Sequence, residues 1–176
     1  VETAGESLVV FNPVSWRRSG AAKASVADLP DEFRLVDTAD RDVPYQVLSR
    51  DSDTSELLMQ MDGVPSCGYT SVSIEAGAPA KHESSLAISE RALENRCFRG
   101  ELDEKGSIVS VYDKKEDRQV LAPGSRANAF QLFEDKPLNY DAWDIDQYYQ
   151  DKMWEVGGVT SVRVLEEGPV RGTVEV

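Results

Sequence analysis

Residues 97–113 read CFRGELDEKGSIVSVYD, and this segment decides the fold class of the chain. Two runs rich in β-branched and aromatic residues, 97–102 and 107–112, flank the four residues DEKG. Runs of this composition that alternate apolar and polar side chains predict strands, and Gly106 can adopt the left-handed backbone that a tight turn requires. The segment therefore predicts an antiparallel β-hairpin.

Similar strand patterns recur along the chain on both sides of this hairpin. Turn-forming residues separate them, for example at 29–32, 38–42 and 166–169. Many short strands joined by turns favour an all-β fold of antiparallel sandwiches. The expected strands are 7–11, 33–37, 43–48, 56–61, 69–75, 96–103, 107–113, 128–133, 159–166 and 169–176.

Only one stretch has helical character. After Pro137, the residues Ala142, Ile145, Tyr149 and Met153 recur at spacings of three and four, which predicts a short helix or turn.

Residues 76–86, AGAPAKHESSL, predict a connector between two packed units. They lack strand periodicity and concentrate Ala, Gly, Pro, Ser and charged residues. The last strand pattern runs to the final residue without a turn or a polar tail. We therefore expect the chain to be part of a longer polypeptide.

Composition and charge exclude several classes of partner. The chain has 176 residues and a net charge of −13, so its surface should repel nucleic acid backbones and anionic membranes. No apolar run is long enough to span a bilayer, and N-x-Ser/Thr acceptors are absent. Two sparse cysteines, Cys67 and Cys97, are interpreted as reduced, buried thiols. We expect a soluble, cytoplasmic protein.

Histidine chemistry is scarce in this sequence. His82 is the only histidine and lies in the expected connector, where an exposed residue is the simplest interpretation. A histidine-containing zinc centre, a Ser-His-Asp triad or a Cys-His pair would have to use it. Glycine-rich phosphate-binding motifs are absent.

The segment FEDKPLNYDAWDID, residues 133–146, is the strongest candidate for a site. Carbohydrate sites combine charged hydrogen-bonding groups with flat apolar rings, and glycoside hydrolysis uses two carboxyl groups about 5–10 Å apart. Asp141 with Asp144, or Glu134 with Asp141, could supply such a pair. The structural alternative makes Trp143 a core residue and uses Asp141 or Asn139 to cap a helical turn.

Several segments resemble one known family. VVFNPVSW (9–16), GVPSCGYTSVSI (63–74), LENRCFRGELDEKGSIVSVYDKK (93–115) and NAFQLFEDKPLNYDAWDID (128–146) are similar to the C-terminal β-rich region of family 38 glycoside hydrolases, the alpha-mannosidases, in their bacterial and vacuolar branch. VPYQVL (43–48) and EEGPVRG (166–172) extend the resemblance over nearly the whole chain.

The resemblance implies a fold for this chain and a location for the catalytic residues outside it. Residues 1–80 would form a small antiparallel β-sandwich, and residues 86–176 the truncated beginning of a larger β-supersandwich. The family's aspartate nucleophile and its zinc ion, held by His and Asp ligands, would belong to a catalytic domain outside these residues. The chain itself would have no catalytic residue, no metal site and no cofactor.

Two functional hypotheses follow. In the first, the chain is a non-catalytic part of a retaining enzyme that removes terminal alpha-D-mannose from oligosaccharides, with Asp141, Trp143 and Asp144 near the substrate groove or the interface with the catalytic domain. It predicts an exposed apolar patch on these residues. In the second, the chain is an autonomous carbohydrate-binding sandwich that stacks sugars on Trp143, Tyr148 and Tyr149.

Overall fold

The computed structural model describes residues 7–82, 84–140 and 143–176. Contacts divide the chain into two compact units. Unit 1 comprises Val1–Leu86 with Glu166–Gly172, and unit 2 comprises Ala87–Leu165 with Thr173–Val176. The described residues are almost entirely strands and turns, and all the pairings described below are antiparallel, which confirms the all-β prediction.

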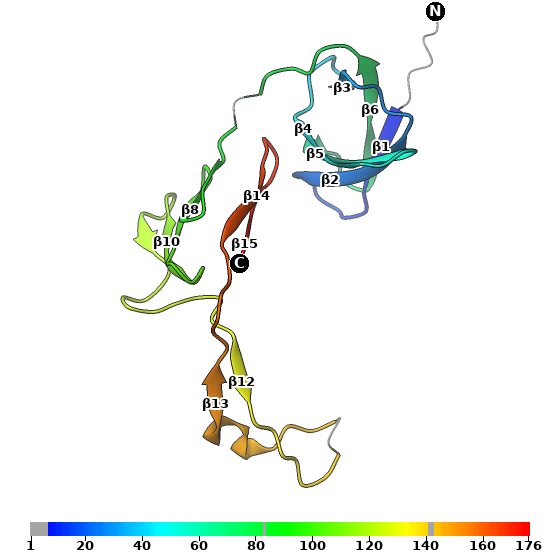
Figure 1. Ribbon diagram of the computed structural model, residues 1–176. Helices are drawn as coiled ribbons and strands as arrows, with labels where there is room; N and C mark the ends of the chain where they lie inside the picture. The colour runs from blue at the N-terminus through cyan, green and yellow to red at the C-terminus, as the bar shows by residue number, and fades with distance from the viewer. Residues whose placement is uncertain (1–6, 83, 141–142) are drawn as a thin grey trace, which may run out of the picture. The chain divides into compact units, whose positions relative to one another are not determined.

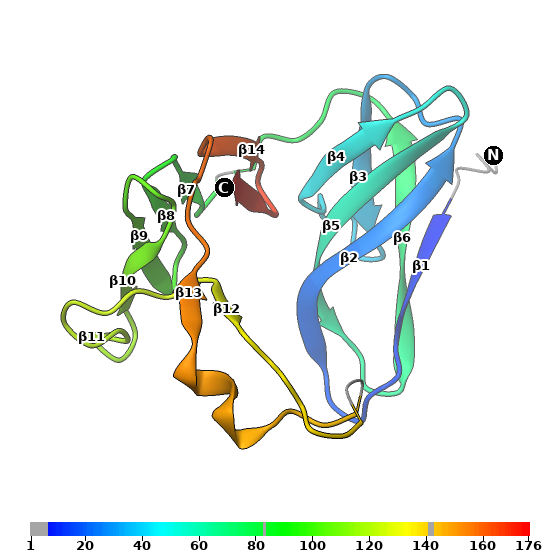
Figure 2. The same cartoon turned by 60° about the horizontal axis from the view of Figure 1, so that its bottom comes forward.

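Two three-stranded sheets form unit 1, and Figure 2 shows them as two layers. One sheet has the strand order β1-β6-β3 and the other β2-β5-β4. Together the two layers make a small β-sandwich, the architecture expected for the first part of the chain. The strands are β1 (Ser7–Asn12), β2 (Arg18–Ala27), β3 (Phe33–Asp37), β4 (Tyr45–Arg50), β5 (Thr54–Val64) and β6 (Gly68–Ala76).

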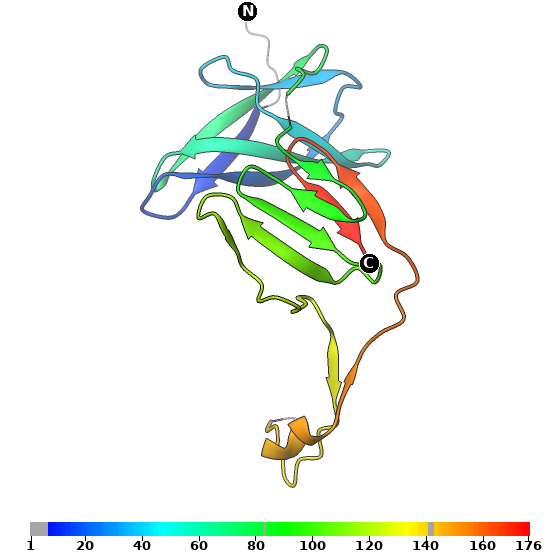
Figure 3. The same cartoon turned by 90° about the vertical axis from the view of Figure 1, so that its left-hand side faces the viewer.

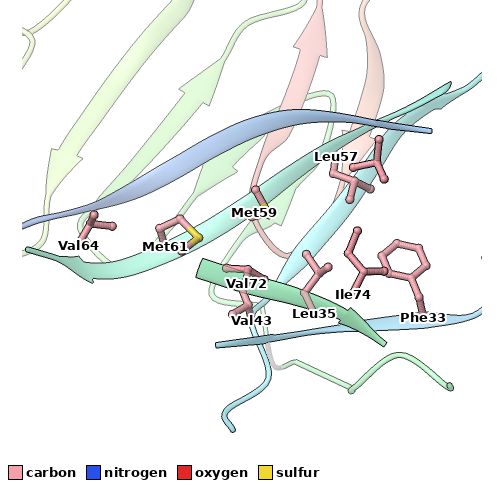
Figure 4. Close-up of a cluster of buried hydrophobic side chains, with 10 residues drawn as sticks. Phe33, Leu35, Val43, Leu57, Met59, Met61, Val64, Val72 and Ile74 are labelled. Carbon is pink, nitrogen blue, oxygen red and sulfur yellow. The ribbon is translucent and has the colours of Figure 1, made fainter. Parts of the chain in front are cut away.

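The core of unit 1 lies between these sheets. Side chains of β5, such as Leu57 and Met59, face Leu35 and Phe33 of β3 and Val72 of β6 (Figure 4). All five are almost completely buried. Burial of each such side chain stabilises a fold by roughly 1.5–3 kcal/mol, so this cluster dominates the stability of unit 1.

The side chain of Asn12 links the β1–β2 connection to the β5–β6 connection by hydrogen bonds. Its side-chain Nδ2 donates hydrogen bonds to the carbonyl oxygens of Trp16 at 2.7 Å, Val64 at 3.2 Å and Pro65 at 2.9 Å. Its Oδ1 accepts from the Val14 N–H at 3.3 Å. Asn12 is 4% exposed, so these partners replace water for a buried amide. The segment VVFNPVSW (9–16) therefore has a structural role in the sandwich through Asn12.

Strand β2 is missing from the strands expected from sequence. Its sequence, RSGAAKASVA, is rich in Ala, Ser and Gly, which have low β-propensity. It forms a strand because it pairs with β5 from Arg18↔Val64 to Ala27↔Thr54. Pairing with a buried neighbour overrides the weak local preference.

The largest sheet of unit 2 has five strands, in the order β11-β10-β9-β8-β7. Successive strands are neighbours, so the sheet is a meander (Figure 3). Leu102 of β9 is the buried hydrophobic side chain that the described part of unit 2 contributes. The strands are β7 (Ala87–Ile88), β8 (Ala92–Glu94), β9 (Phe98–Leu102), β10 (Ile108–Asp113) and β11 (Arg118–Gln119).

The hairpin predicted at 97–113 is confirmed as β9 and β10. Gly106 has φ +71°, the left-handed conformation expected of it. The Asp103 carboxylate accepts hydrogen bonds from the N–H groups of Lys105 and Ser107 and closes the turn. These backbone bonds, the Ser107 one foremost, hold the pKa of Asp103 below its ordinary value.

Two further hairpins complete the chain. Strands β12 (Gln131–Phe133) and β13 (Met153–Glu155) pair with each other, as do β14 (Arg163–Glu167) and β15 (Gly172–Glu175). Between β12 and β13 lies the 3₁₀ helix η1 (Gln147–Asp151), whose first turn is capped by Asp146. Figure 1 shows β12 and β13 side by side, with η1 beyond them.

The helix expected over 142–153 is therefore shorter than its pattern. Ala142 lies outside the described residues, Ile145 is exposed, and Met153 belongs to β13. Met153 pairs with Phe133, and this ladder ends the helical turn. The helical spacing of these residues is accidental, because Tyr149 lies in η1 and Met153 lies in the strand β13 that follows it.

The interpretation of the two cysteines as buried was wrong. Cys67 and Cys97 are both free and exposed. Cys67 occupies a turn before β6 with φ +45°, and its N–H donates to the Val14 carbonyl. Each cysteine lies one residue before a strand, in a turn, so its side chain is not covered by a sheet. No helix in the described part of the chain has the length and hydropathy needed to cross a membrane.

Candidate functional site: an acidic, aromatic arm

The candidate site lies on the segment that runs from β12 through η1 to β13, residues 130–156, which we call the arm. Apart from residues 141–142, it is described in full. The sequence of the arm contains seven acidic residues and two lysines, so its charge is strongly negative. It contains the whole of the segment 133–146 singled out from sequence.

On one face of the arm, side chains of η1 and of the β12–β13 hairpin contact each other. The ring of Tyr149 in η1 packs edge-on against Phe133 in β12, with ring centroids 5.3 Å apart. Next to this pair, the Glu134 carboxylate contacts the ammonium groups of Lys136 and Lys152, each at 3.0 Å. These contacts fix η1 against the hairpin.

The opposite face of the β12–β13 hairpin carries apolar side chains that are exposed to solvent. Residues directly opposite each other in an antiparallel pair project to the same side, and Leu132 is paired with Trp154. The ladder continues through a hydrogen bond from the Val156 N–H to the Phe130 carbonyl. The four side chains therefore lie on one face, which we call the stripe. Their exposed fractions are 72% for Phe130, 59% for Leu132, 51% for Trp154 and 59% for Val156.

Trp143 and Asp144 lie at the far end of the arm. The N–H groups of both donate to the carbonyl oxygen of Tyr140, at 2.7 and 3.0 Å, which makes a turn there. Trp143 is 91% exposed, so the alternative in which it is a core residue is wrong. Asp144 is exposed as well, and Asp141 lies outside the described residues.

A depression of about 370 Å³ lies beside η1. Two tyrosine rings, several carboxylates and two ammonium groups surround it, which is the mixture of flat and hydrogen-bonding groups that sugars require. Its lining consists of Glu134, Lys136, Leu138, Asp146, Tyr148, Tyr149, Asp151 and Lys152.

Glu134 is unsuited to the role of a general acid. Its hydrogen bonds with Lys136 and then Lys152 hold its pKa below the ordinary value. A glycosidase acid must instead keep its proton near neutral pH, which needs a raised pKa. Glu134 is therefore an ionised, structural carboxylate. The cap of η1 is Asp146, rather than the Asp141 or Asn139 considered from sequence.

Metal binding finds no support in the part of the chain that the structure describes. No group of three or more His, Cys, Asp or Glu side chains is arranged there to hold an ion. Zinc needs about four such ligands at close range. The zinc ion that the family resemblance implies is expected in a catalytic domain outside these residues, and no chemical step of this chain is assigned to a metal.

Comparison with known proteins gives one family. Residues 93–176 match the model of the Glycosyl hydrolases family 38 C-terminal domain. Alpha-mannosidase 2C1 of Mus musculus is 32% identical over 117 residues, which cover 62% of this chain, and its Homo sapiens counterpart is 35% identical over 82 residues, which cover 46%. A crystal structure of a protein in the Glycosyl Hydrolase Family 38 from Enterococcus faecalis matches 98% of this chain with a TM-score of 0.71 and 11% identity.

Residues 93–176 therefore belong to the family 38 C-terminal domain, as the resemblance predicted for this part of the chain, and the match to the solved structure extends the likeness of fold over nearly the whole chain. The chain spans only a small part of its relatives. The match covers 11% of the mouse protein, 8% of the human protein and 24% of the Enterococcus faecalis chain.

Proposed function

We propose that this chain is a non-catalytic part of a cytoplasmic alpha-mannosidase that removes terminal alpha-D-mannose from oligosaccharides. The arm contacts the catalytic domain and contributes Asp141, Trp143 and Asp144 to the rim of the substrate groove or to the domain interface. The relatives named alpha-mannosidase support the reaction class. Two free, exposed cysteines are consistent with a reducing compartment.

One observation carries this proposal: the arm exposes its aromatic side chains. Trp143 is 91% exposed and Tyr140 77%, although each could bury a large apolar area. Exposed apolar surfaces of this kind mark contact sites for proteins or ligands. Both residues lie within residues 93–176, the part that matches the family model.

The same proposal assigns catalysis to a domain outside this chain. The aspartate nucleophile and the zinc ion are held by the catalytic domain, outside these 176 residues. The chain alone should therefore show no mannosidase turnover and retain no zinc after dialysis. Turnover or a retained zinc ion in the purified 176-residue chain would contradict this division.

The test of the arm uses the full-length enzyme. We expect Trp143→Ala to lower kcat/KM for an aryl alpha-mannoside about fivefold, because one lost aromatic contact weakens binding on the order of 1 kcal/mol. Trp16→Ala is the matched control, since Trp16 is also an exposed tryptophan but lies in unit 1. Asp144→Asn is compared with Asp135→Asn in the same way. Unchanged kinetics and unchanged thermal stability in both Trp143→Ala and Asp144→Asn would reject the role of the arm.

A second function is favoured by the exposed rings of the arm, of which Tyr148 lines the depression beside η1. Trp143 and Tyr148 are free to stack on a sugar, whereas Tyr149 already packs against Phe133. An autonomous mannose-binding module would therefore use the first two. Titration calorimetry of this chain with mannose and mannobiose separates the functions. Binding at millimolar or lower Kd supports the module, and absence of heat supports the accessory role.

A further inference from the structure

A cavity of about 450 Å³ lies within unit 1, at one end of the sandwich. Ligand pockets in proteins measure about 300–1,000 Å³, so the cavity has room for a small ligand. The β3–β4 connection forms one side of it, and the end of β5 forms another. Residues of four polar types, Arg, Asp, Gln and Thr, make up most of its lining. The cavity therefore suits a ligand that is rich in hydrogen-bonding groups.

Hydrogen bonds hold one wall of this cavity in place. The Asp37 carboxylate accepts from the N–H groups of Ala39 at 2.8 Å and Arg41 at 3.0 Å. Its other oxygen accepts from Nε of Arg41 at 2.9 Å and contacts a terminal nitrogen of the same guanidinium at 2.7 Å. The charges of Asp37 and Arg41 therefore neutralise each other within the wall, which is formed before a ligand arrives.

Arg17 and Asp62 line the same cavity but form no such pair. In the part of the chain that the structure describes, neither side chain takes part in a salt bridge, and Asp62 accepts one long hydrogen bond, at 3.4 Å from Gln60. The Arg17 side chain lies against Gly63, since a Cβ there would be 3.3 Å from its Nη1 and 3.6 Å from its Cδ. A guanidinium donor and a carboxylate acceptor are thus both available to a ligand.

A β-bulge sets the position of Asp62. The register of β2 against β5 shifts between Arg18 and Gly20. Ser19 therefore lies opposite both Asp62 and Gly63. Gly63 has φ +66°, and its N–H donates to the Ser19 hydroxyl at 3.0 Å. Bulges redirect the side chains next to them and are common beside functional sites.

We propose that this cavity binds one unit of a saccharide, whose hydroxyl groups accept from Arg17 and donate to Asp62. A hydroxyl group both donates and accepts, so a neutral sugar can pair with both charges. An anion would be repelled by Asp62 and by the net charge of −13, and a cation by Arg17. The site is separate from the arm, and the choice of a saccharide rests on the proposed function.

Tyr69 adds a flat apolar surface to the cavity, as sugar sites require. Its side chain is 64% exposed, and the ring of Phe11 packs beside it with centroids 5.7 Å apart. Phe11 and Tyr69 are directly opposite each other in the β1–β6 pair, which keeps this contact in register.

Carboxyl labelling of the full-length enzyme measures binding at this cavity alone. Asp62 and Asp53 are both exposed carboxylates of unit 1, but Asp62 lines the cavity and Asp53 does not. The enzyme reacts with a water-soluble carbodiimide and glycine ethyl ester, with and without mannose, and peptide mass spectrometry gives the rate at each aspartate. Mannose at about four times its Kd should lower the rate at Asp62 about fivefold and leave Asp53 unchanged.

Two arginines supply matched variants. Arg17→Gln should abolish the protection of Asp62, because it removes the guanidinium from the cavity. Arg18→Gln should keep the protection, since Arg18 is the neighbouring exposed arginine and does not line this cavity. Equal thermal unfolding of both variants shows that the fold is retained. Protection that survives Arg17→Gln would overturn the proposal.

Other outcomes would also overturn it. One is an Asp62 rate that mannose leaves unchanged up to about 100 mM, far above a millimolar Kd. Equal protection by glycerol would show an adventitious additive only, and protection by glycine without protection by mannose would show a zwitterionic ligand. An Asp62 that reacts in the 176-residue chain but not in the full-length enzyme would show that another segment covers the cavity.

The cavity and the proposed function can fail separately. Protection of Asp62 with unchanged kinetics and stability of Trp143→Ala would support the cavity and reject the role of the arm. The reverse result would keep the arm and overturn the cavity. In calorimetry of the 176-residue chain, mannose binding that Arg17→Gln removes and Trp143→Ala retains would belong to the cavity and support it.

Discussion

Unit 1 and unit 2 are made of the same kind of antiparallel strand, yet they differ in where their apolar side chains lie. Apart from Leu102, the buried hydrophobic side chains of the described residues all belong to unit 1. Unit 2 exposes rings such as Phe130, Trp143 and Trp154. A two-layer sandwich closes its own core, whereas a meander with a long hairpin leaves apolar side chains on exposed faces.

The largest expected effect comes from the core of unit 1. Leu57→Ala should lower the free energy of unfolding by about 2–5 kcal/mol, because it removes a fully buried side chain from a packed cluster. The matched change in unit 2 is Leu102→Ala, for which we expect less than about 2 kcal/mol because fewer buried side chains surround it. Urea denaturation of both variants measures the difference. Equal losses would show that unit 2 has a core of its own.

A smaller effect is expected from two asparagines with structural hydrogen bonds. Asn12→Ala should cost about 1–3 kcal/mol, because it leaves buried carbonyl groups of unit 1 without their donor. In unit 2, Asn128 bonds the Ile108 N–H and the Gly106 carbonyl at the surface of a loop. Asn128→Ala should therefore cost less, since water can replace these bonds. Thermal unfolding compares the two, and a larger loss for Asn128→Ala would contradict this ranking.

The smallest effect is a dependence on pH. Hydrogen bonds from Arg41 hold the pKa of Asp37 in unit 1 below its ordinary value, and the Ser107 N–H does the same for Asp103 in unit 2. A carboxylate whose folded-state pKa is lowered stabilises the fold above its unfolded pKa of about 4, and this contribution is lost as the pH falls through the lowered value.

Asp37→Asn should therefore reduce stability at pH 7 and leave it nearly unchanged near pH 2, and Asp103→Asn should behave alike. Urea denaturation at the two pH values measures both. A variant whose loss is the same at both pH values would show that the carboxylate charge is not responsible. A loss for Asp37→Asn alone would confine the effect to unit 1.

The sequence predicted most of the strands because their residues alternate and turn formers separate them. The hairpin around Gly106 was clear, since strand pattern and turn chemistry agree there. Strand β2 was not predictable in this way, because its alanines and serines carry no strand signal and its conformation comes from β5.

The arm shows a different limit of sequence reasoning. Residues 133–146 stood out by composition, but Trp143 could equally have been a core residue until its exposure was known. The stripe was missed altogether. Alternation marks Phe130 and Leu132, yet nothing in the sequence gives the register that places Trp154 beside Leu132.

The hydrogen bonds of Asn12 bear on how natural variants of this region should be interpreted. An asparagine inside a segment that resembles a glycoside hydrolase family invites a role in turnover, but this side chain holds two loops of a sandwich in place. Alleles that change it should reduce the amount of folded protein in cells and spare the specific activity of the molecules that remain.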